Sequence, residues 1–253
     1  MSIETVIFVC VALSTTVFGK DTRIGGGDDT NNHQFSYHAS LKSIYSNDYL
    51  CGGAIISKKH ILTTAYCVNI GNIIYSDLMI QVGTTKKSNT DGLIVFPDRI
   101  FSHPMYTGRP SSTTNKLYNI AIIRIKETLP FNNYQNKVML PSMDVINNFV
   151  GTLSGWSTDL NMANVPMDRL KMAIMIIIDM NICKSSASFA IYSDQFCTYH
   201  ERITLTNSDN GSPLVSDNRL IGLADTSQQI LGHEQLFVNV FSHIEYIRYI
   251  VGK

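Results

Sequence analysis

The residues of this sequence whose chemistry is easiest to define are its five cysteines. Cys10 lies in an apolar stretch at the amino terminus, and the others are Cys51, Cys67, Cys183 and Cys197. A zinc site is the competing interpretation, but no two of these cysteines form the closely spaced Cys-x-x-Cys pair that such sites use. Cys10 would be removed with a signal peptide, which leaves four cysteines. An even number in an exported chain favours two disulfides and no metal site.

The amino terminus predicts export. Residues 5–13 form an apolar run that is too short to span a bilayer. The sequence Val17-Phe18-Gly19 then places small residues at the two positions that signal peptidase reads. We therefore expect residues 1–19 to be a signal peptide, residues 20–23 to be a short pro-segment, and the mature protein to be secreted. The alternative interpretation of the apolar run is a buried first strand.

The composition argues against several classes of partner. The chain has 253 residues, 44% of them hydrophobic, with 20 basic and 20 acidic side chains. A formal net charge of zero gives no excess of positive charge to attract nucleic acid or anionic lipid. No other stretch reaches the roughly 18 uninterrupted apolar residues of a transmembrane helix. We expect no nucleic acid, no membrane and no cofactor.

The elements that must position any functional side chain are mostly short strands. From residue 24 to about residue 240, short β-rich runs alternate with Gly, Asn, Asp, Ser or Pro, without intervening amphipathic helices. This pattern predicts an all-β fold of antiparallel sheets. The run Met172–Met180 is rich in β-branched residues and favours a buried strand. Residues 241–252 repeat their apolar residues at helical spacing and predict a C-terminal helix, with Ser242 as a candidate cap.

Eight local motifs, in chain order, resemble those of the chymotrypsin family of serine proteases. The segment at 23–27 is similar to the family's activation cleavage site, and Leu-Thr-Thr-Ala-Tyr-Cys at 62–67 resembles the catalytic-histidine motif Leu-Thr-Ala-Ala-His-Cys. The strand at 118–123 resembles the one that carries the catalytic aspartate. Ser-Asp-Asn-Gly-Ser-Pro-Leu at 208–214 resembles the nucleophile loop Gly-Asp-Ser-Gly-Gly-Pro-Leu. The remaining matches are Cys51-Gly52-Gly53, His103-Pro104-Met105-Tyr106, Leu140-Pro141 and Ser154-Gly155-Trp156.

The resemblance implies two antiparallel six-stranded β-barrels with an active site in the cleft between them. The N-terminal barrel would span about residues 24–135, the C-terminal barrel about residues 136–240, and a short C-terminal helix would follow. It also implies one disulfide for each barrel, Cys51–Cys67 and Cys183–Cys197, each contributing about 2–4 kcal/mol to stability.

The resemblance further implies an activation step. Cleavage between Arg23 and Ile24 would free the Ile24 ammonium to form a buried ion pair with Asp209, which would organise the surrounding loops.

All three catalytic positions carry other residues. Tyr66 stands for the histidine, and a phenol that titrates near pH 10 cannot shuttle protons at neutral pH. Asn119 stands for the aspartate and is neutral. Asn210 stands for the serine, and a carboxamide nitrogen is not a nucleophile. Ser208 replaces a glycine whose N–H helps to bind the oxyanion, and losing one such donor costs about 10²–10³ in rate.

The substrate pocket that the resemblance implies is altered as well. Thr206 stands where the family has a cysteine that braces the pocket, and Thr204 falls near the pocket base. Asp225-Thr226-Ser227 replaces the wall sequence Ser-Trp-Gly. The only Asn-x-Ser/Thr sequon begins at Asn210, in a loop where we expect no glycan.

A tyrosine and two asparagines at the triad, with a signal peptide and short pro-segment, resemble the inactivated protease paralogues of the scabies mite, which are related to the mite group 3 allergens. This resemblance implies secretion into the gut lumen and binding of host plasma proteins that blocks complement activation. We expect a monomeric pseudoprotease acting through surface loops, with 43–49, 72–76 and 107–116 as candidates.

Two alternatives remain. One is a regulatory homologue that binds an active protease, its zymogen or its inhibitor. The other is hydrolysis by unconventional residues. Ser208, Ser212, His60 and His103 lie near the motifs, but they offer no complete set of nucleophile, base and orienting group.

Overall fold

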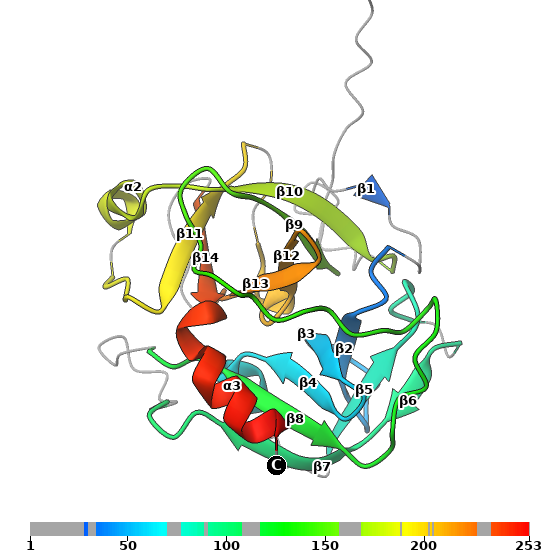
Figure 1. Ribbon diagram of the computed structural model, residues 1–253. Coiled ribbons are helices and arrows are strands. Elements are labelled where there is room, and N and C mark those ends of the chain that lie inside the picture. Colours follow the sequence, from blue (N-terminus) through cyan, green and yellow to red (C-terminus); the bar gives the residue numbers. More distant parts are fainter. Residues whose placement is uncertain are drawn as a thin grey trace, which may run out of the picture.

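The chain folds into two antiparallel sheets and a C-terminal helix (Figure 1). The structure is a computed structural model and describes residues 28–29, 34–69, 77–88, 91–107, 117–156, 168–187, 189–201, 203, 205–226 and 234–252. The strands are β1 (Asp28–Asp29), β2 (His38–Ser43), β3 (Tyr49–Ser57), β4 (His60–Thr63), β5 (Leu78–Val82), β6 (Leu93–Val95), β7 (Pro97–Ser102), β8 (Ala121–Ile125), β9 (Val150–Gly155), β10 (Lys171–Ile177), β11 (Gln195–Tyr199), β12 (Pro213–Ser216), β13 (Arg219–Ala224) and β14 (Glu234–Asn239). The helices are α1 (Ala65–Val68), α2 (Met180–Ser186), η2 (Asn207–Asp209), η3 (Phe241–His243) and α3 (Ile244–Val251).

The N-terminal sheet has the strand order β6-β5-β2-β3-β4-β8-β7. Its two edge strands, β6 and β7, follow one another in the chain with only Phe96 between them, so together they act as one interrupted strand of a six-stranded sheet that curls on itself. Apolar side chains on the inner face alternate with outward ones, as the period of a strand requires. The interior is filled by residues such as Leu41, Ile55 and Ile80, all with no exposed area.

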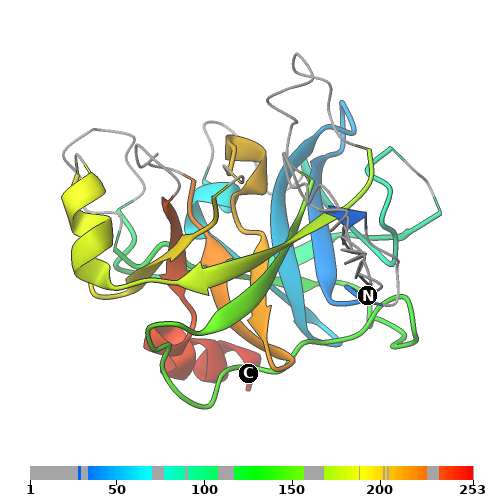
Figure 2. The same cartoon turned by 90° about the horizontal axis from the view of Figure 1, so that it is seen from above.

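The C-terminal sheet closes into a ring. Its strand order is β10-β11-β14-β13-β12-β9, and a further pairing of β10 with β9 completes the circle, while β1 adds to the outside of β10. Figure 2 shows β10 crossing the near side of this sheet, with α2 beyond its end. The predicted all-β fold of two six-stranded antiparallel sheets and a short C-terminal helix is confirmed.

A third group of buried residues joins the two sheets. It combines Leu62 and Ile122 of the N-terminal sheet with Val238 of the C-terminal sheet, and Ile247 of α3 packs against the same group. Trp156, only 1% exposed, belongs to it and donates its indole N–H to the Thr85 carbonyl oxygen at 3.1 Å. The helix thus fixes the barrels against each other through apolar burial.

Two local expectations differ in detail from the structure. The run Met172–Met180 divides into strand β10 and the first residue of α2, where the Asp179 carboxylate accepts a hydrogen bond from the Asn181 N–H and caps the helix. The C-terminal segment begins with the turn η3, so the cap of α3 is His243 and not Ser242, and the His243 side chain makes no cap hydrogen bond. The 3₁₀ turn that precedes α3 leads the chain into this helix without a capping side chain.

Some expectations fall on residues outside the described ranges. These are the signal peptide at 1–19, the pro-segment at 20–23, the cleavage site Arg23-Ile24, the loop at 72–76, and the loop at 107–116 apart from Thr107. Within the described part of the chain, no helix is long and apolar enough to cross a membrane.

Candidate functional site

The positions of the expected histidine and aspartate lie side by side where the end of β4 meets the start of β8. Tyr66 sits in the single turn of α1, which the disulfide between Cys67 and Cys51 of β3 ties to the sheet. Asn119, 1% exposed, lies just before β8. Its Oδ1 atom accepts a hydrogen bond of 2.8 Å from the backbone N–H of Tyr66. The asparagine therefore holds the backbone of α1 rather than a neighbouring side chain.

The expected nucleophile position is turned inward. Asn210 has no exposed area, and its Oδ1 accepts a hydrogen bond of 2.9 Å from the Thr64 hydroxyl. Its carbonyl oxygen accepts a second hydrogen bond, of 2.8 Å, from the Gly52 N–H. These contacts join the loop of the C-terminal sheet to β3 and to the start of α1 in the N-terminal sheet. The side chain of Asn210 is a buried link between the two barrels, and the sequon that it begins is inaccessible in the folded chain.

The loop backbone turns through a short 3₁₀ helix, η2. The N–H of Asn210 donates to the Asn207 carbonyl oxygen at 3.4 Å, and the N–H of Asp209 donates to the Thr206 carbonyl oxygen at 2.9 Å. The Ser208 hydroxyl lies 2.7 Å from that of Thr206. An oxyanion site needs free N–H groups aimed at the reacting oxygen. In this loop the N–H at the nucleophile position is engaged in the turn.

Gly211 allows the loop to approach the N-terminal sheet. Its φ of +77° lies in the left-handed region, and an added Cβ would come within 2.4 Å of the Gly52 carbonyl oxygen and 2.5 Å of the Thr63 hydroxyl oxygen. Only glycine meets both demands. The glycine that follows Asn210 thus has a structural reason to be retained.

Asp209 is fully buried behind the loop. Its Oδ2 accepts hydrogen bonds from the Thr206 N–H at 2.8 Å and the Thr206 hydroxyl at 3.1 Å. Burial, with a smaller contribution from the Asp209 charge, raises the pKa of the nearby Tyr49 phenol far above its usual value. The expected partner of Asp209, the Ile24 ammonium, lies outside the described residues, so that ion pair stays a prediction.

A comparison with known proteins identifies the scaffold. The sequence model of a protein family described as "Trypsin" matches residues 24–247. The chain belongs to the trypsin family.

Several curated trypsins are similar over most of their length. Trypsin epsilon of Drosophila erecta is 30% identical over 207 residues, which cover 80% of this chain and 77% of that protein. Trypsin delta of the same fly is 28% identical over 212 residues, covering 82% and 79%. Trypsin-3 of Salmo salar is 26% identical over 217 residues, covering 84% and 85%.

The expected specificity pocket of this trypsin-family chain is described in part. Thr204 and Ser227 lie outside the described residues, Thr206 caps η2, and Thr226 is buried. Asp225 is 1% exposed, and its Oδ2 accepts a hydrogen bond of 3.1 Å from the Gln195 amide. The carboxylate at the pocket wall is therefore internal to the C-terminal sheet rather than open to a substrate.

A tyrosine, Tyr106, lies within electrostatic range of Asp225. Burial raises the pKa of Tyr106 to about 12, with smaller contributions from the negative charges that Asp225 and Tyr66 carry when ionised. The Tyr106 phenol thus lies within electrostatic range of both the Asp225 carboxylate and the Tyr66 phenol. At neutral pH the Tyr106 phenol therefore stays protonated and can only donate or accept hydrogen bonds.

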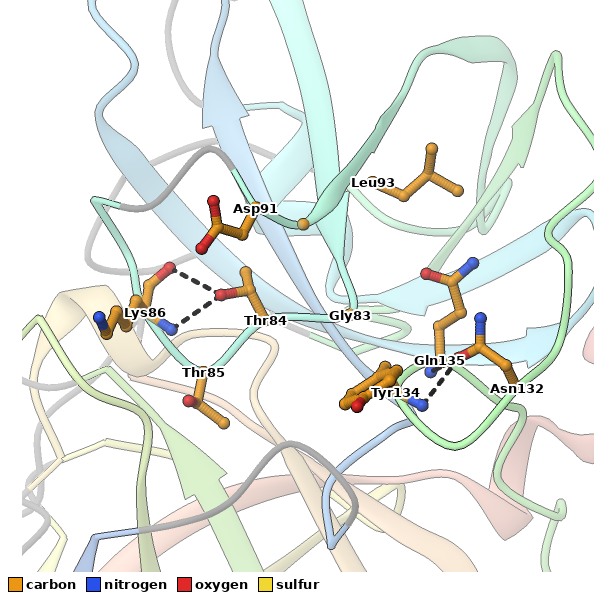
Figure 3. Close-up of a pocket in the computed structure, with 10 residues that line it drawn as sticks. Gly83, Thr84, Thr85, Lys86, Asp91, Leu93, Asn132, Tyr134 and Gln135 are labelled. Atoms are coloured by element: carbon orange, nitrogen blue, oxygen red, sulfur yellow. Dashed lines mark hydrogen bonds between the residues drawn. The ribbon is translucent and has the colours of Figure 1, made fainter.

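A polar cavity of about 680 Å³ lies elsewhere, between the β5–β6 connection and the segment that crosses to the second sheet (Figure 3). Tyr134, Asn132 and Gln135 form one side of it, and Thr84 and Asp91 lie across from them. The Asn132 Oδ1 atom accepts hydrogen bonds from the N–H groups of Tyr134 and Gln135. None of the triad positions lines this cavity. No group of three or more metal-binding side chains occurs among the residues that the structure describes.

Sequence reasoning missed two residues that matter here. Thr64 stands where the family motif has alanine, and its hydroxyl is the partner of Asn210. The replacement of a small apolar residue by a donor, together with the change to Asn210, was the signal that could have revealed this pair. Gln195 carries no such signal, because only the strand register of β11 brings it to Asp225.

Proposed function

We propose that this trypsin-family chain is a catalytically inactive, secreted binding protein. The observation that carries the proposal is the state of Asn210, which stands at the nucleophile position, has no exposed area and is hydrogen-bonded to Thr64. A carboxamide offers no nucleophile for acyl transfer. The neighbouring Tyr66 is a phenol and cannot take up a proton at neutral pH, so the general base is missing as well.

The backbone of the loop supports the same proposal. The N–H of Asn210 is engaged with the Asn207 carbonyl oxygen, so stabilisation of an oxyanion would require the turn to open. Residual rates in proteases without a triad depend on such donors. With triad and donor both altered, we expect no measurable peptide hydrolysis.

A serine-directed fluorophosphonate probe tests inactivity directly. We expect no covalent labelling of the mature protein, with or without prior cleavage after Arg23, while an active trypsin in the same assay is labelled. The triple variant Tyr66→His, Asn119→Asp, Asn210→Ser asks whether the triad alone is missing. Labelling of the unaltered protein at any residue contradicts the proposal.

The expected partners are host plasma proteins of the complement system. The resemblance of the triad substitutions to those of the inactivated scabies mite paralogues supports this choice. One candidate contact loop, 43–49, is described, and it carries Tyr45 with 82% of its surface exposed. Exposed tyrosines commonly anchor protein interfaces because a large ring becomes buried at a small cost in conformational entropy.

A complement-activation assay in serum with the mature protein tests this partner class. We expect inhibition that weakens several-fold in Tyr45→Ala. It should weaken less or not at all in the matched control Tyr249→Ala, a residue that is 63% exposed on α3. If the protein leaves complement unaffected and a serum pull-down recovers an active protease or its inhibitor instead, the regulatory alternative replaces this one.

A further inference from the structure

A row of basic side chains crosses three neighbouring strands of the N-terminal sheet. In the strand register, His60 of β4 lies opposite Arg124 of β8, and Arg124 lies opposite Arg99 of β7. Residues directly opposite one another in antiparallel strands point to the same face. The three side chains therefore form a line on one face of the sheet, across the strands β4, β8 and β7 that lie side by side in Figure 1.

Two lysines extend this line. The turn between β3 and β4 holds Lys59, and its carbonyl oxygen accepts a hydrogen bond of 3.0 Å from the Ile125 N–H, which places the turn beside the end of β8. Lys126 follows directly and is exposed, as are Lys59 and Arg99. We call the set Lys59, His60, Arg99, Arg124 and Lys126 the basic row. All of its members except Arg99 line a cavity of about 460 Å³, together with Asp98 and Ile125.

The charges of the basic row act on one another. The pKa of His60 is lowered first by burial and then by the positive charges of Arg124 and Lys59. The imidazole Nδ1 lies 2.8 Å from the Ser57 hydroxyl. Asp98 neutralises one member of the row, since its Oδ2 lies 2.7 Å from Arg124 Nε. Three further cations line up beside this single ion pair, although like charges on adjacent strands destabilise a sheet.

The net charge of the chain does not indicate this surface, because the charges of 20 acidic and 20 basic residues add up to zero. A local concentration of Arg and Lys around an open cavity is a site for an anion. Guanidinium groups bind the oxygens of sulfate or phosphate in a bidentate manner, and lysines add point charges.

The lining of the cavity narrows the class of ligand. The only apolar residue that lines it is Ile125, which is 1% exposed. The guanidinium groups of Arg99 and Arg124 lie 6.0 and 5.9 Å from the centre of the neighbouring Phe101 ring. Single-stranded nucleic acid binds through stacking on exposed rings, and an acidic peptide would need apolar pockets for its anchors. A ligand with charged groups along its length and hydroxyl groups elsewhere needs neither exposed rings nor apolar pockets.

We propose that the basic row binds a sulfated polysaccharide, with sulfate groups seated against Arg99, Arg124 and Lys126. The site lies on the opposite end of β8 from the altered triad, so the proposal is independent of the inactivity and complement proposals above. Binding depends on ionic contacts and weakens steeply as salt concentration rises.

The test uses heparin as the probe and the mature protein in surface plasmon resonance at several salt concentrations. We expect Arg99→Gln and Lys126→Gln each to weaken binding on the order of tenfold and to reduce its salt dependence. The matched control is Lys184→Gln, which removes one exposed positive charge from α2 and is expected to leave the affinity unchanged. Asp98→Asn removes the only acid of the cavity and is expected to tighten binding.

Thermal unfolding of each variant shows that it folds, and Lys59→Gln, in an exposed turn, replaces any variant that does not. Equal losses in Lys184→Gln and the row variants would overturn the site, as would an absence of heparin binding at low salt. Desulfated heparin, single-stranded DNA and poly-glutamate serve as further ligands. Stronger binding of any of these than of heparin would overturn the sulfated-polysaccharide assignment.

Discussion

The two ends of strand β8 use polar side chains in opposite ways. At its start, Asn119 is buried and holds the backbone of α1, and Asn210, also buried, accepts a hydrogen bond from Thr64 just before this helix. At its other end, Arg124 belongs to the basic row, where most cations face solvent around an open cavity. Polar groups of the first kind stabilise the fold, because a buried donor or acceptor is costly without its partner. Groups of the second kind contribute little to stability and stay available to a ligand.

The largest expected effect is a loss of stability at the buried start of β8. Gly211→Ala would force a Cβ at positive φ against two oxygen atoms, and we expect it to lower the free energy of unfolding by about 3 kcal/mol. Urea unfolding measures the loss. Gly83→Ala is the matched control, since its φ is also +77° but its Cβ would meet the end of the Gln135 side chain, which can move. Its loss should be about 1 kcal/mol, and equal losses would show that the close approach of the loop has no energetic weight.

A second effect depends on pH. His38 is buried between Ser154, whose hydroxyl lies 2.8 Å from its Nδ1, and Trp156, and burial lowers its pKa to about 3. Below the unfolded pKa of about 6.5 the unfolded chain binds a proton that the folded chain excludes. Stability should therefore fall as pH drops from 6.5 toward 3, by about 2 kcal/mol between pH 7.5 and pH 5.

Urea unfolding of the unaltered protein and of His38→Gln at both pH values measures this contribution. The variant should lose less stability than the parent on acidification. The same dependence in both proteins would assign it to other groups.

A smaller effect tests the link between the barrels. Thr64→Val keeps the shape of the side chain but removes the hydroxyl that donates to Asn210 Oδ1. The buried amide oxygen loses this donor, so we expect a loss of about 1–2 kcal/mol in chemical unfolding. Thr64→Ser retains the donor and should recover most of the loss. If valine and serine behave alike, the hydrogen bond is not what the site requires.

The smallest expected effect lies at the other end of β8. Arg99→Gln should change the free energy of unfolding by no more than about 0.5 kcal/mol, because the residue is exposed. A slight gain in the free energy of unfolding is expected, since the substitution removes a positive charge opposite Arg124. A loss as large as that of Thr64→Val would mean that the basic row is structural, and the contrast between the two ends would fail.

Much of the fold could be predicted from local sequence. Alternation of apolar and turn residues predicted the short strands, and the helical spacing after residue 240 predicted α3, because side-chain period depends on neighbouring residues alone. The substitutions Tyr66, Asn119 and Asn210 could also be read from motifs. The roles that they took on could not, since the partners of Asn119 and Asn210 lie 53 and 146 residues away in sequence.

The sequence by itself determined the family, the kind of fold and which residues stand at the three expected catalytic positions. Only the tertiary structure decided that Asn210 faces Thr64, that Asp225 faces Gln195, and that His60, Arg99 and Arg124 form one line. The reason is that hydrogen bonds and charge interactions act over a few ångströms in space, whereas composition sums charges over the whole chain. A neutral sequence can therefore fold so that several basic side chains gather on one face of a sheet.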